Sequence, residues 1–466
     1  MRYISGPMMR LSGKIRVTKA NGGAIPKEAR VTLINNFGNA WIKSIGVRVG
    51  NQSVNLSKGV SYYWKTLVSN LLNYSDDVRG GSLRASGVYN SPEMLHGKPA
   101  PTGDNMHKIR AWPHLMEIRK RCANSKWVDF CTDINADFLR TRREFLNGTD
   151  VELIFHRNPD EFVLMRDKEV EGWRPFPPDN YTGEKYPTLA HEPTADAIKT
   201  FLDADARVRG KLRRLDAQSD ETINSEDGKT LPNFTKRKVD NEAYKYELTD
   251  LILHVRKLEP SDKLLSFNNS RVLTSPAKYL VQEWQQNSFV LPAGQNRVTT
   301  TPLFGSRVPT RTVYIIVRLD AERGSYDTNP EILEPYNLRR FVQRVGGVPS
   351  PLEELEYDWD NEQFSVPFRM LLDNCGICTL NKSNGITYDS FKNHTFMIAY
   401  ANSPMGVSSI ADPNRSRVQK GSEVIAELTF DNRDNRTLLL LAFGITDSAF
   451  GLDQNRQLLY ERETAI

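Results

Sequence analysis

The sequence lacks the features that mark membrane-spanning and secreted proteins. No window approaches 18 consecutive apolar residues, so no segment predicts a transmembrane helix. The first ten residues, Met1–Arg10, contain neither an apolar signal core nor a cleavage site, which argues against a Sec signal. Only four of 466 residues are cysteine, too few for a disulfide framework, so a reducing compartment is expected.

An excess of charge of one sign is also missing. The net charge of +5 at pH 7 is small for this length and does not mark a dedicated nucleic-acid binder. With 39% apolar and 26% charged residues the composition is that of a globular protein, and the length suggests two or three domains. The 17 tyrosines and 20 phenylalanines favour strands.

Catalytic motifs are absent as well. The sequence contains no GxxxxGK phosphate loop, no GxSxG elbow and no HExxH metal motif. The seven histidines include no His-x-His pair of the kind a cupin metal site needs; they are His96, His107, His114, His156, His191, His254 and His394. His156 and His254 fall on expected strands, where a lone histidine is more typical of an outward polar position. We therefore predict no catalytic residue, no cofactor-binding residue and no metal ligand.

The cysteines offer two weaker possibilities. Cys375-Gly-Ile-Cys378 is a single CxxC, and its first cysteine continues the apolar stripe of an expected helix, which favours buried structural thiols over zinc or redox chemistry. Cys122 and Cys131 lie near His107 and His114, but their irregular spacing does not favour a metal.

The stretch Tyr246–Val317 organises the chain. The alternation of apolar residues in Tyr246–Leu258 changes phase near Asp250, which predicts a β-bulge there. Polar residues 259–276 follow and are predicted to be a linker. Strands resume at Ser288–Pro292 and at Arg311–Val317, the second of which is apolar on both faces and is therefore expected to be buried.

The pattern before this stretch reappears after it. In the first half, Val49–Asn51 precedes an expected helix whose apolar residues repeat at helical spacing up to Leu71–Asn73. In the second half, Val345–Gly347 likewise precedes an expected helix whose apolar residues extend to Leu371–Asp373. Further matched pairs are Asn147–Phe155 with Lys420–Phe430, and Leu251–Val255 with Leu438–Phe443. Other expected strands are Lys14–Thr18, Val31–Asn35, Ser44–Val49, Lys126–Phe130 and Asp160–Met165, while residues 75–120 are expected to lie outside the core.

Residues 167–243 interrupt the first copy. Thr194 caps an expected helix that runs to Leu215, and residues 216–240 are polar enough to predict an exposed, mobile loop. The basic run Arg207–Arg214 is typical of a solvated helix face rather than of a phosphate site. We expect the helix to pack on a neighbouring jelly roll or subunit through its apolar stripe.

About eight strands per half, long excursions and one short helix between early strands fit a jelly roll. An immunoglobulin sandwich is less suitable, because its Cys…Trp…Cys framework is missing. We therefore predict an all-β fold of two tandem jelly-roll β-sandwich domains, a double jelly roll with short helices and long loop insertions. The expected domains are residues 1–258 with the insertion 167–243, a linker at 259–276, and residues 277–466.

At this point the chain resembles a known family over nearly its whole length outside residues 167–243. The matching segments are Asn35–Asn51, Leu71–Tyr74, Phe145–Met165, Ile252–Lys257, Leu303–Gly305, Pro309–Arg311, Gly324–Tyr326, Asn329–Pro330 and Asn384–Ile386. Their order and spacing resemble the hexon-like double-jelly-roll major capsid protein of Polinton/Maverick elements and adintoviruses. Relatives carry a further strand before the segment that matches Tyr3-Ile4, so we expect a truncated sequence or a rearranged first strand.

The resemblance implies a homotrimer whose six jelly rolls form a pseudo-hexagonal capsomer. Such capsomers contact neighbouring capsomers and a penton-type minor capsid protein in an icosahedral shell around DNA, with only weak, non-specific contact to the packaged DNA. It also implies a location in the virion capsid, after synthesis in the host cytoplasm and assembly in the nucleus or cytoplasm. Two alternatives stay open: a host-domesticated jelly roll that binds carbohydrate or a receptor, and a cupin-like metalloenzyme, which the missing His-x-His pair disfavours.

Overall fold

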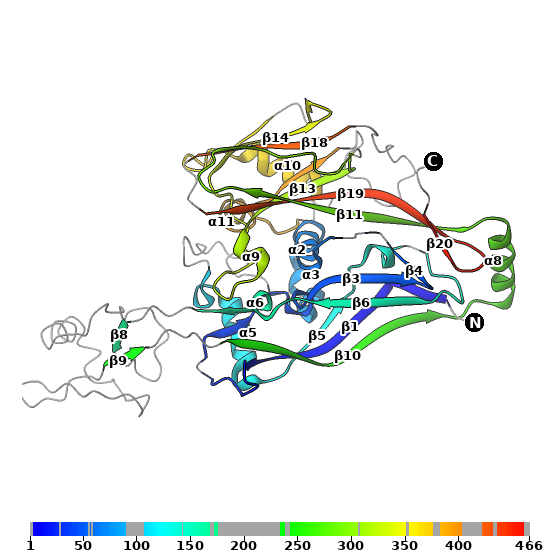
Figure 1. The fold of residues 1–466 in the computed structure, drawn as a ribbon, viewed down its shortest axis with the longest axis horizontal. Coiled ribbons are helices and arrows are strands. Elements are labelled where there is room, and N and C mark those ends of the chain that lie inside the picture. The colour runs from blue at the N-terminus through cyan, green and yellow to red at the C-terminus, as the bar shows by residue number, and fades with distance from the viewer. Residues whose placement is uncertain are drawn as a thin grey trace, which may run out of the picture. The chain divides into compact units, whose positions relative to one another are not determined.

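The computed structural model describes residues 3–27, 29–54, 56, 59–89, 107–141, 143–167, 172–175, 234–237, 243–305, 308–350, 354–375, 383–402, 422–431 and 436–460. The chain separates into two compact units, of which one comprises Met1–Arg166 with Tyr244–Ile466 and the other Asp167–Ala243. The larger unit holds two β-sandwiches, drawn one above the other in Figure 1. A continuous cluster of buried apolar side chains runs through both sandwiches.

The second sandwich consists of two five-stranded antiparallel sheets. One has the order β11 (Ala277–Leu291), β19 (Leu438–Leu452), β13 (Arg311–Arg318), β17 (Ile398–Ala401), with β20 (Leu458–Tyr460) also on β19. The other has the order β12 (Arg297–Thr299), β18 (Val424–Phe430), β14 (Leu338–Val345), β15 (Val348–Pro349), with β16 (Leu355–Glu356) also on β14.

Strands β13 and β19 are apolar at successive positions because both faces of their sheet are covered. The second sheet lies on one side, and the first sandwich lies on the other (Figure 1). In β13 every residue from Thr312 to Val317 is buried, which confirms the prediction for Arg311–Val317. A strand that is shielded on both faces needs no alternation of polar and apolar side chains.

The first sandwich repeats the central part of this arrangement. One sheet has the order β10 (Tyr244–Leu258), β1 (Tyr3–Lys19), β5 (Val128–Asp133), and the other β4 (Gln52–Ser53), β3 (Ile42–Val49), β6 (Val151–Arg157). The order β10-β1-β5 corresponds to β19-β13-β17, and β6-β3-β4 corresponds to β18-β14-β15. A small sheet pairs β2 (Val31–Leu33) with β7 (Leu164–Arg166). The chain is therefore a double jelly roll, and the internal repeat predicted from the sequence is confirmed.

Matching turns and helices support the same correspondence. Gly50 joins β3 to β4 with φ 55°, and Gly346 joins β14 to β15 with φ 59°, both in the left-handed region that favours glycine. Each turn is followed by the main helix of its half, α2 (Tyr62–Asn73) or α10 (Ser365–Cys375). Helix α2 is buried from Tyr62 to Leu72 on all its faces.

The predicted β-bulge near Asp250 is confirmed. Strand β1 pairs Ser12 with Ile252 but Lys14 with Thr249, so one extra residue stands on β10. Asp250 has φ 53° and accepts a hydrogen bond from Lys14 Nζ at 2.8 Å. The bulge therefore changes which side chains of β10 face the core.

Two predictions about the first half are wrong. Asp160–Met165 is not one strand, because α6 (Asp160–Val163) precedes β7. Pro159 stands directly before that helix, and acidic residues in its first turn favour the helical conformation. Residues 75–120 do not all lie outside the core either, since helix α5 (Pro113–Cys122) buries Leu115 and Ile118 within this range. Pro113 in its first turn and basic residues in its last were the available signals.

The segment predicted as a linker, residues 259–276, contains helix α8 (Asp262–Thr274), which Ser261 caps by accepting a hydrogen bond from the backbone N–H of Leu264 at 3.4 Å. Shorter helices complete the larger unit: α1 (Phe37–Ala40), α3 (Asp76–Gly80), η1 (Ser82–Ser86), η3 (Ile109–Ala111), η4 (Ala123–Ser125), η5 (Asp137–Leu139), α9 (Leu319–Arg323) and α11 (Tyr388–Asn393).

The insertion is described only in part. Strand β8 (Gly172–Pro175) pairs with β9 (Phe234–Arg237), so the end of the predicted loop 216–240 is a strand rather than a loop. Phe234–Arg237 has a single apolar residue, Phe234, so no alternating pattern in the sequence indicated this strand. The predicted helix Thr194–Leu215 and the rest of the predicted loop lie outside the described residues.

Candidate functional site

The histidines and cysteines considered from the sequence do not form a metal or catalytic cluster in the described part of the chain. No group of three or more His, Cys, Asp or Glu residues there has metal-binding geometry. Burial raises the pKa of Cys122 to about 12, so this thiol stays protonated at neutral pH. A ring nitrogen of His107 accepts from the backbone N–H of Asn329 at 3.3 Å, and His114 lies 3.4 Å from a carboxylate oxygen of Glu331.

The remaining candidates are equally separate from one another. His156 and His254 are exposed on strands β6 and β10, as expected, and His254 shares a hydrogen bond of 2.7 Å with Ser12. The side chain of Cys375 and the residue Cys378 lie outside the described residues, as do His96 and His191.

The interdomain interface, where the two jelly rolls meet, contains a buried ion pair. Lys65 on α2 donates to Asp137 of η5, and these side chains are 3% and 2% exposed. The second carboxylate oxygen of Asp137 accepts from the backbone N–H of Trp284 on β11 at 2.8 Å. Burial lowers the pKa of Lys65 and raises that of Asp137, while their mutual attraction opposes both shifts. The pair therefore ties the first jelly roll to the second.

An aromatic stack lies in the same interface. The ring of Phe138 stacks on Phe145 at 5.0 Å and on Phe450 at 4.6 Å between centroids. Tyr279 in turn stacks on Phe450 at 5.0 Å. Phe138 and Phe145 belong to the first jelly roll, whereas Tyr279 and Phe450 lie on β11 and β19 of the second. Large flat side chains from both halves thus share one packed layer.

Further polar contacts join the halves around this layer. Arg456 donates to the carbonyl oxygen of Asn147 at 2.7 Å, and Arg166 to Asp327 at 3.1 Å. Arg79, which is buried, donates to the carbonyl oxygen of Asn384. Because these contacts lie at several places along the interface, the two jelly rolls form one block. Polar pairs far apart in sequence leave no local pattern, so these contacts were not predictable.

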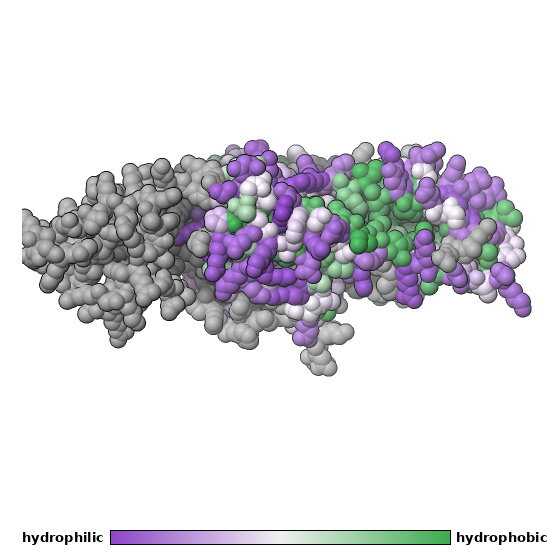
Figure 2. Space-filling view, turned by 90° about the horizontal axis from the view of Figure 1, so that it is seen from below, coloured by the Kyte–Doolittle hydropathy of each residue, from purple (hydrophilic) through white to green (hydrophobic). Residues whose placement is uncertain are grey.

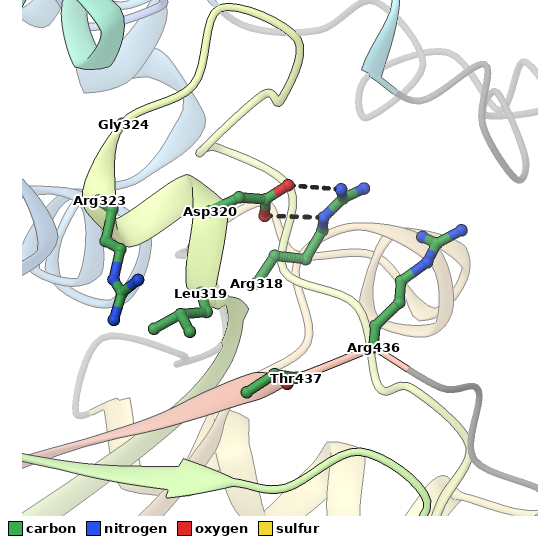
Figure 3. A pocket seen from close by; sticks show the side chains of 7 residues that line it. All are labelled: Arg318, Leu319, Asp320, Arg323, Gly324, Arg436 and Thr437. Carbon is green, nitrogen blue, oxygen red and sulfur yellow. Dashed lines mark hydrogen bonds and ion pairs between the residues drawn. The ribbon is translucent and has the colours of Figure 1, made fainter.

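A pocket of about 450 Å³ lies beside α9 and is lined by Arg318, Leu319, Asp320, Arg323, Gly324, Arg436 and Thr437. Arg318 holds Asp320 through two hydrogen bonds of 3.0 and 2.6 Å. Burial opposes ionisation of Asp320, but the hydrogen bonds and charge of Arg318 outweigh it and hold the pKa of this carboxyl below its usual value. Figure 3 shows Arg323 pointing away from this pair, so the arginines do not converge on one point.

Among the described residues, strand β10 presents a run of exposed apolar side chains. Leu251, Ile252 and Leu253 are 47%, 55% and 43% exposed, in a run without an intervening charge. Figure 2 shows hydrophobic side chains gathered on the face seen from below, the side on which β10 lies, with hydrophilic residues around them. In the described residues β10 pairs only with β1, so its other edge is an open edge of the sheet. An exposed apolar edge strand is a place where other chains bind.

No helix among the described residues is long and apolar enough to cross a membrane.

No protein-family model matches the chain. An uncharacterized protein of Caenorhabditis elegans is 19% identical over 424 residues, which cover 90% of this chain and 79% of that protein.

Among solved structures, the chain is similar to VP54 of PBCV-1, a crystal structure fitted into a cryo-EM reconstruction of the virophage Sputnik. The TM-score is 0.50 at 8% identity, with 99% of this chain and 90% of that chain covered. The mavirus major capsid protein gives a TM-score of 0.44 at 10% identity, with 100% and 88% covered. The match to VP54 supports the double-jelly-roll fold.

Proposed function

We propose that this chain is a major capsid protein, a structural protein that assembles with copies of itself into an icosahedral shell around a DNA genome. The observation that carries the proposal is the joining of two jelly rolls into one block through the Lys65–Asp137 pair and the aromatic stack, in the fold shared with VP54 of PBCV-1. A protein that works by tiling needs fixed geometry more than a reactive site.

The assembly unit in this proposal is a homotrimer. Two similar sandwiches held in one block give each chain two comparable β-domains, so three chains supply six and can form a pseudo-hexagonal capsomer. The division into residues 1–258, the linker 259–276 and residues 277–466 is part of this proposal. An obligate interface of this kind buries more than about 2,000 Å², and apolar edges such as that of β10 suit it.

The more specific origin, a Polinton/Maverick element or an adintovirus, is supported by the segment Phe145–Met165. Its core has a structural role: the side chain of Asn158 donates to the carbonyl oxygens of Ala40 at 2.7 Å and of Ile42 at 3.2 Å. The backbone carbonyl of Asn158 accepts from the hydroxyl of Tyr246, and Arg157 lies 3.8 Å from the centre of the Tyr246 ring. The motif thus joins α1 and β3 to β6 and β10, which explains its value to this fold.

Light scattering on the purified protein tests the assembly. We expect a particle of three chains of 53.1 kDa each, and pseudo-hexagonal outlines in negative-stain electron microscopy. A stable monomer at micromolar concentration would contradict the proposal and favour a jelly-roll binding module instead. The neighbouring capsomers and a penton-type minor capsid protein would be the further partners in a virion.

Contact with the genome should be weak and independent of sequence, because the net charge is only +5. We expect any binding of a fluorescent duplex to fall steeply between about 50 and 200 mM salt, and to be equal for duplexes of different sequence. Tight binding to one sequence at physiological salt would contradict this part of the proposal.

A further inference from the structure

The Lys65–Asp137 pair is enclosed by large apolar side chains. Its two members are 3% and 2% exposed. Trp284, whose ring centre lies 5.9 Å from the Lys65 amine, is 7% exposed, and Phe138, next to Asp137 in the sequence, is 1% exposed. A charge is poorly solvated in such surroundings, so they favour the uncharged form of each group.

Both groups are shifted toward their uncharged forms. Burial lowers the pKa of the Lys65 amine against the attraction of Asp137, and the positive charge of Arg140 lowers it further. Burial also raises the pKa of the Asp137 carboxyl, although the charge and hydrogen bond of Lys65 oppose this shift. A proton that moves from the amine to the carboxylate leaves a neutral amine beside a carboxylic acid. The first is a nucleophile, and the carboxyl carbon of the second is an electrophile.

The backbone around the pair holds both groups in position to react. Lys65 Nζ contacts Asp137 Oδ1 directly and donates to the carbonyl oxygen of Asn135 at 3.0 Å. The other carboxyl oxygen, Asp137 Oδ2, accepts from the backbone N–H of Trp284 at 2.8 Å. Attack on the carboxyl carbon places negative charge on this oxygen, and the N–H stabilises it as an oxyanion hole does. Helices α2 and η5 are buried, which keeps the amine and the carboxyl together.

We propose that Lys65 and Asp137 join in an intramolecular isopeptide bond. After the proton transfer, Nζ attacks Cγ of Asp137 and the N–C bond forms. A second proton passes from Nζ to Oδ1, the bond between Cγ and Oδ1 breaks, and Oδ1 leaves as water. An ammonium and a carboxylate thus become one amide and one water molecule, with no oxidant and no co-reactant. The ion pair is the state before this reaction.

The bond strengthens the interdomain interface from within the first jelly roll. It links residues that are 72 positions apart in the sequence, on α2 and η5. A covalent link of this kind restricts the unfolded chain and thereby stabilises the folded one. Oδ2 remains as the amide oxygen and keeps its hydrogen bond to Trp284 of the second jelly roll. The reaction needs only one folded chain, so it does not depend on the proposed capsid function.

Intact-mass spectrometry of the purified full-length chain, unfolded for the measurement, tests the bond. We expect the mass to be lower than that of the sequence by one water molecule. The mass of the sequence without this loss, both in fresh protein and after prolonged incubation of the folded chain, would overturn the proposal.

Trypsin locates the bond, because it does not cut after a lysine whose amine is acylated. We expect one branched product, in which Gly59–Arg79 is uncut at Lys65 and is joined to Trp127–Arg140. Tandem mass spectrometry should place the branch at Lys65 and Asp137. A branch at any other pair of residues would contradict the assignment.

Two variants complete the test. Lys65→Met should have the full mass of its sequence, and a loss of water in this variant would overturn the proposal. Lys14→Met is the matched control, because Lys14 and Asp250 make a similar contact of 2.8 Å at 50% and 54% exposure. Their hydrogen bond raises the pKa of Lys14 and lowers that of Asp250, so both stay charged. The Lys14→Met chain should therefore lose one water molecule as the unaltered chain does.

Discussion

Lys65 and Asp137 face each other where neither charge has access to water, and each therefore depends on the other. Breaking a buried pair by removing one partner costs about 3–5 kcal/mol, because an unpaired charge stays behind. We expect Asp137→Leu to lower the free energy of unfolding by about that amount, as measured by denaturant titration. The double variant Lys65→Met with Asp137→Leu should recover part of the loss; an equal or greater loss would show that the charge pairing is not what matters.

Cys122 gives a second prediction at the residue scale. With a pKa of about 12 and a side chain at 0% exposure, it should resist alkylation by iodoacetamide at pH 8 in the folded protein. Site-resolved mass spectrometry should find Cys122 modified only after unfolding, while the half-buried Cys131 serves as the internal comparison. Rapid modification of Cys122 in the native chain would show that α5 opens readily.

At the scale of the elements, the strand-to-strand turns of the two halves offer a paired experiment. Gly50 and Gly346 both adopt positive φ, and an added Cβ would meet nothing closer than Ser422 Oγ at 3.4 Å from Gly346. Replacement by alanine should therefore lower the free energy of unfolding by about 1–2 kcal/mol at each site, because alanine adopts a positive φ less readily than glycine. The asparagine variants, which tolerate this conformation better, should lose less; a large difference between the halves would argue against equivalent turns.

The elements also show where sequence reasoning succeeds. Strands with unbroken apolar runs and the bulge at Asp250 were predictable because each leaves a local pattern. Helix α5 was missed because it lies in a Gly- and Pro-rich region that seemed irregular as a whole. Helix α8 was missed because its apolar residues do not form one buried stripe: Leu264, Phe267 and Leu273 are exposed, and Val272 is its buried residue. Strand β11 was predicted only from Ser288, since Ala277–Asn287 mixes buried and exposed positions without regular alternation.

For the whole molecule, the interdomain interface predicts how the chain unfolds. Since the jelly rolls share buried contacts, β1 and β13 should lose protection against hydrogen exchange at the same denaturant concentration. Phe450→Ala removes the ring that stacks on Phe138 and Tyr279. This variant should lower the free energy of unfolding by about 3–5 kcal/mol. We expect that variant to separate the unfolding of the two halves. Independent unfolding of the halves in the unaltered protein would contradict the single-block description.

The sequence predicted the double jelly roll of the whole molecule, because a duplicated pattern survives even when residue identity does not. It did not predict the interface between the two halves. The partners Lys65 with Asp137 and Arg79 with Asn384 come from separate elements, and only the folded chain brings them together. Nor did it predict that β10 would be exposed where β19 is buried, although the difference in charge was an available signal: β10 carries charged side chains along its length, whereas Asp447 is the one charged residue of β19.

In the described residues, Leu251–Leu253 of β10 are exposed whereas Leu438–Thr446 of β19 are buried, so the two jelly rolls present different surfaces and the block is directional. A contact between the first jelly roll of one chain and the second of the next is heterologous, because it joins two different surfaces. Contacts of this type repeat head to tail, and they form a closed ring when the rotation between chains returns to its start or a filament when it does not. The difference between β10 and β19 therefore gives the chain a polarity from which a cyclic trimer with a defined hand can be built.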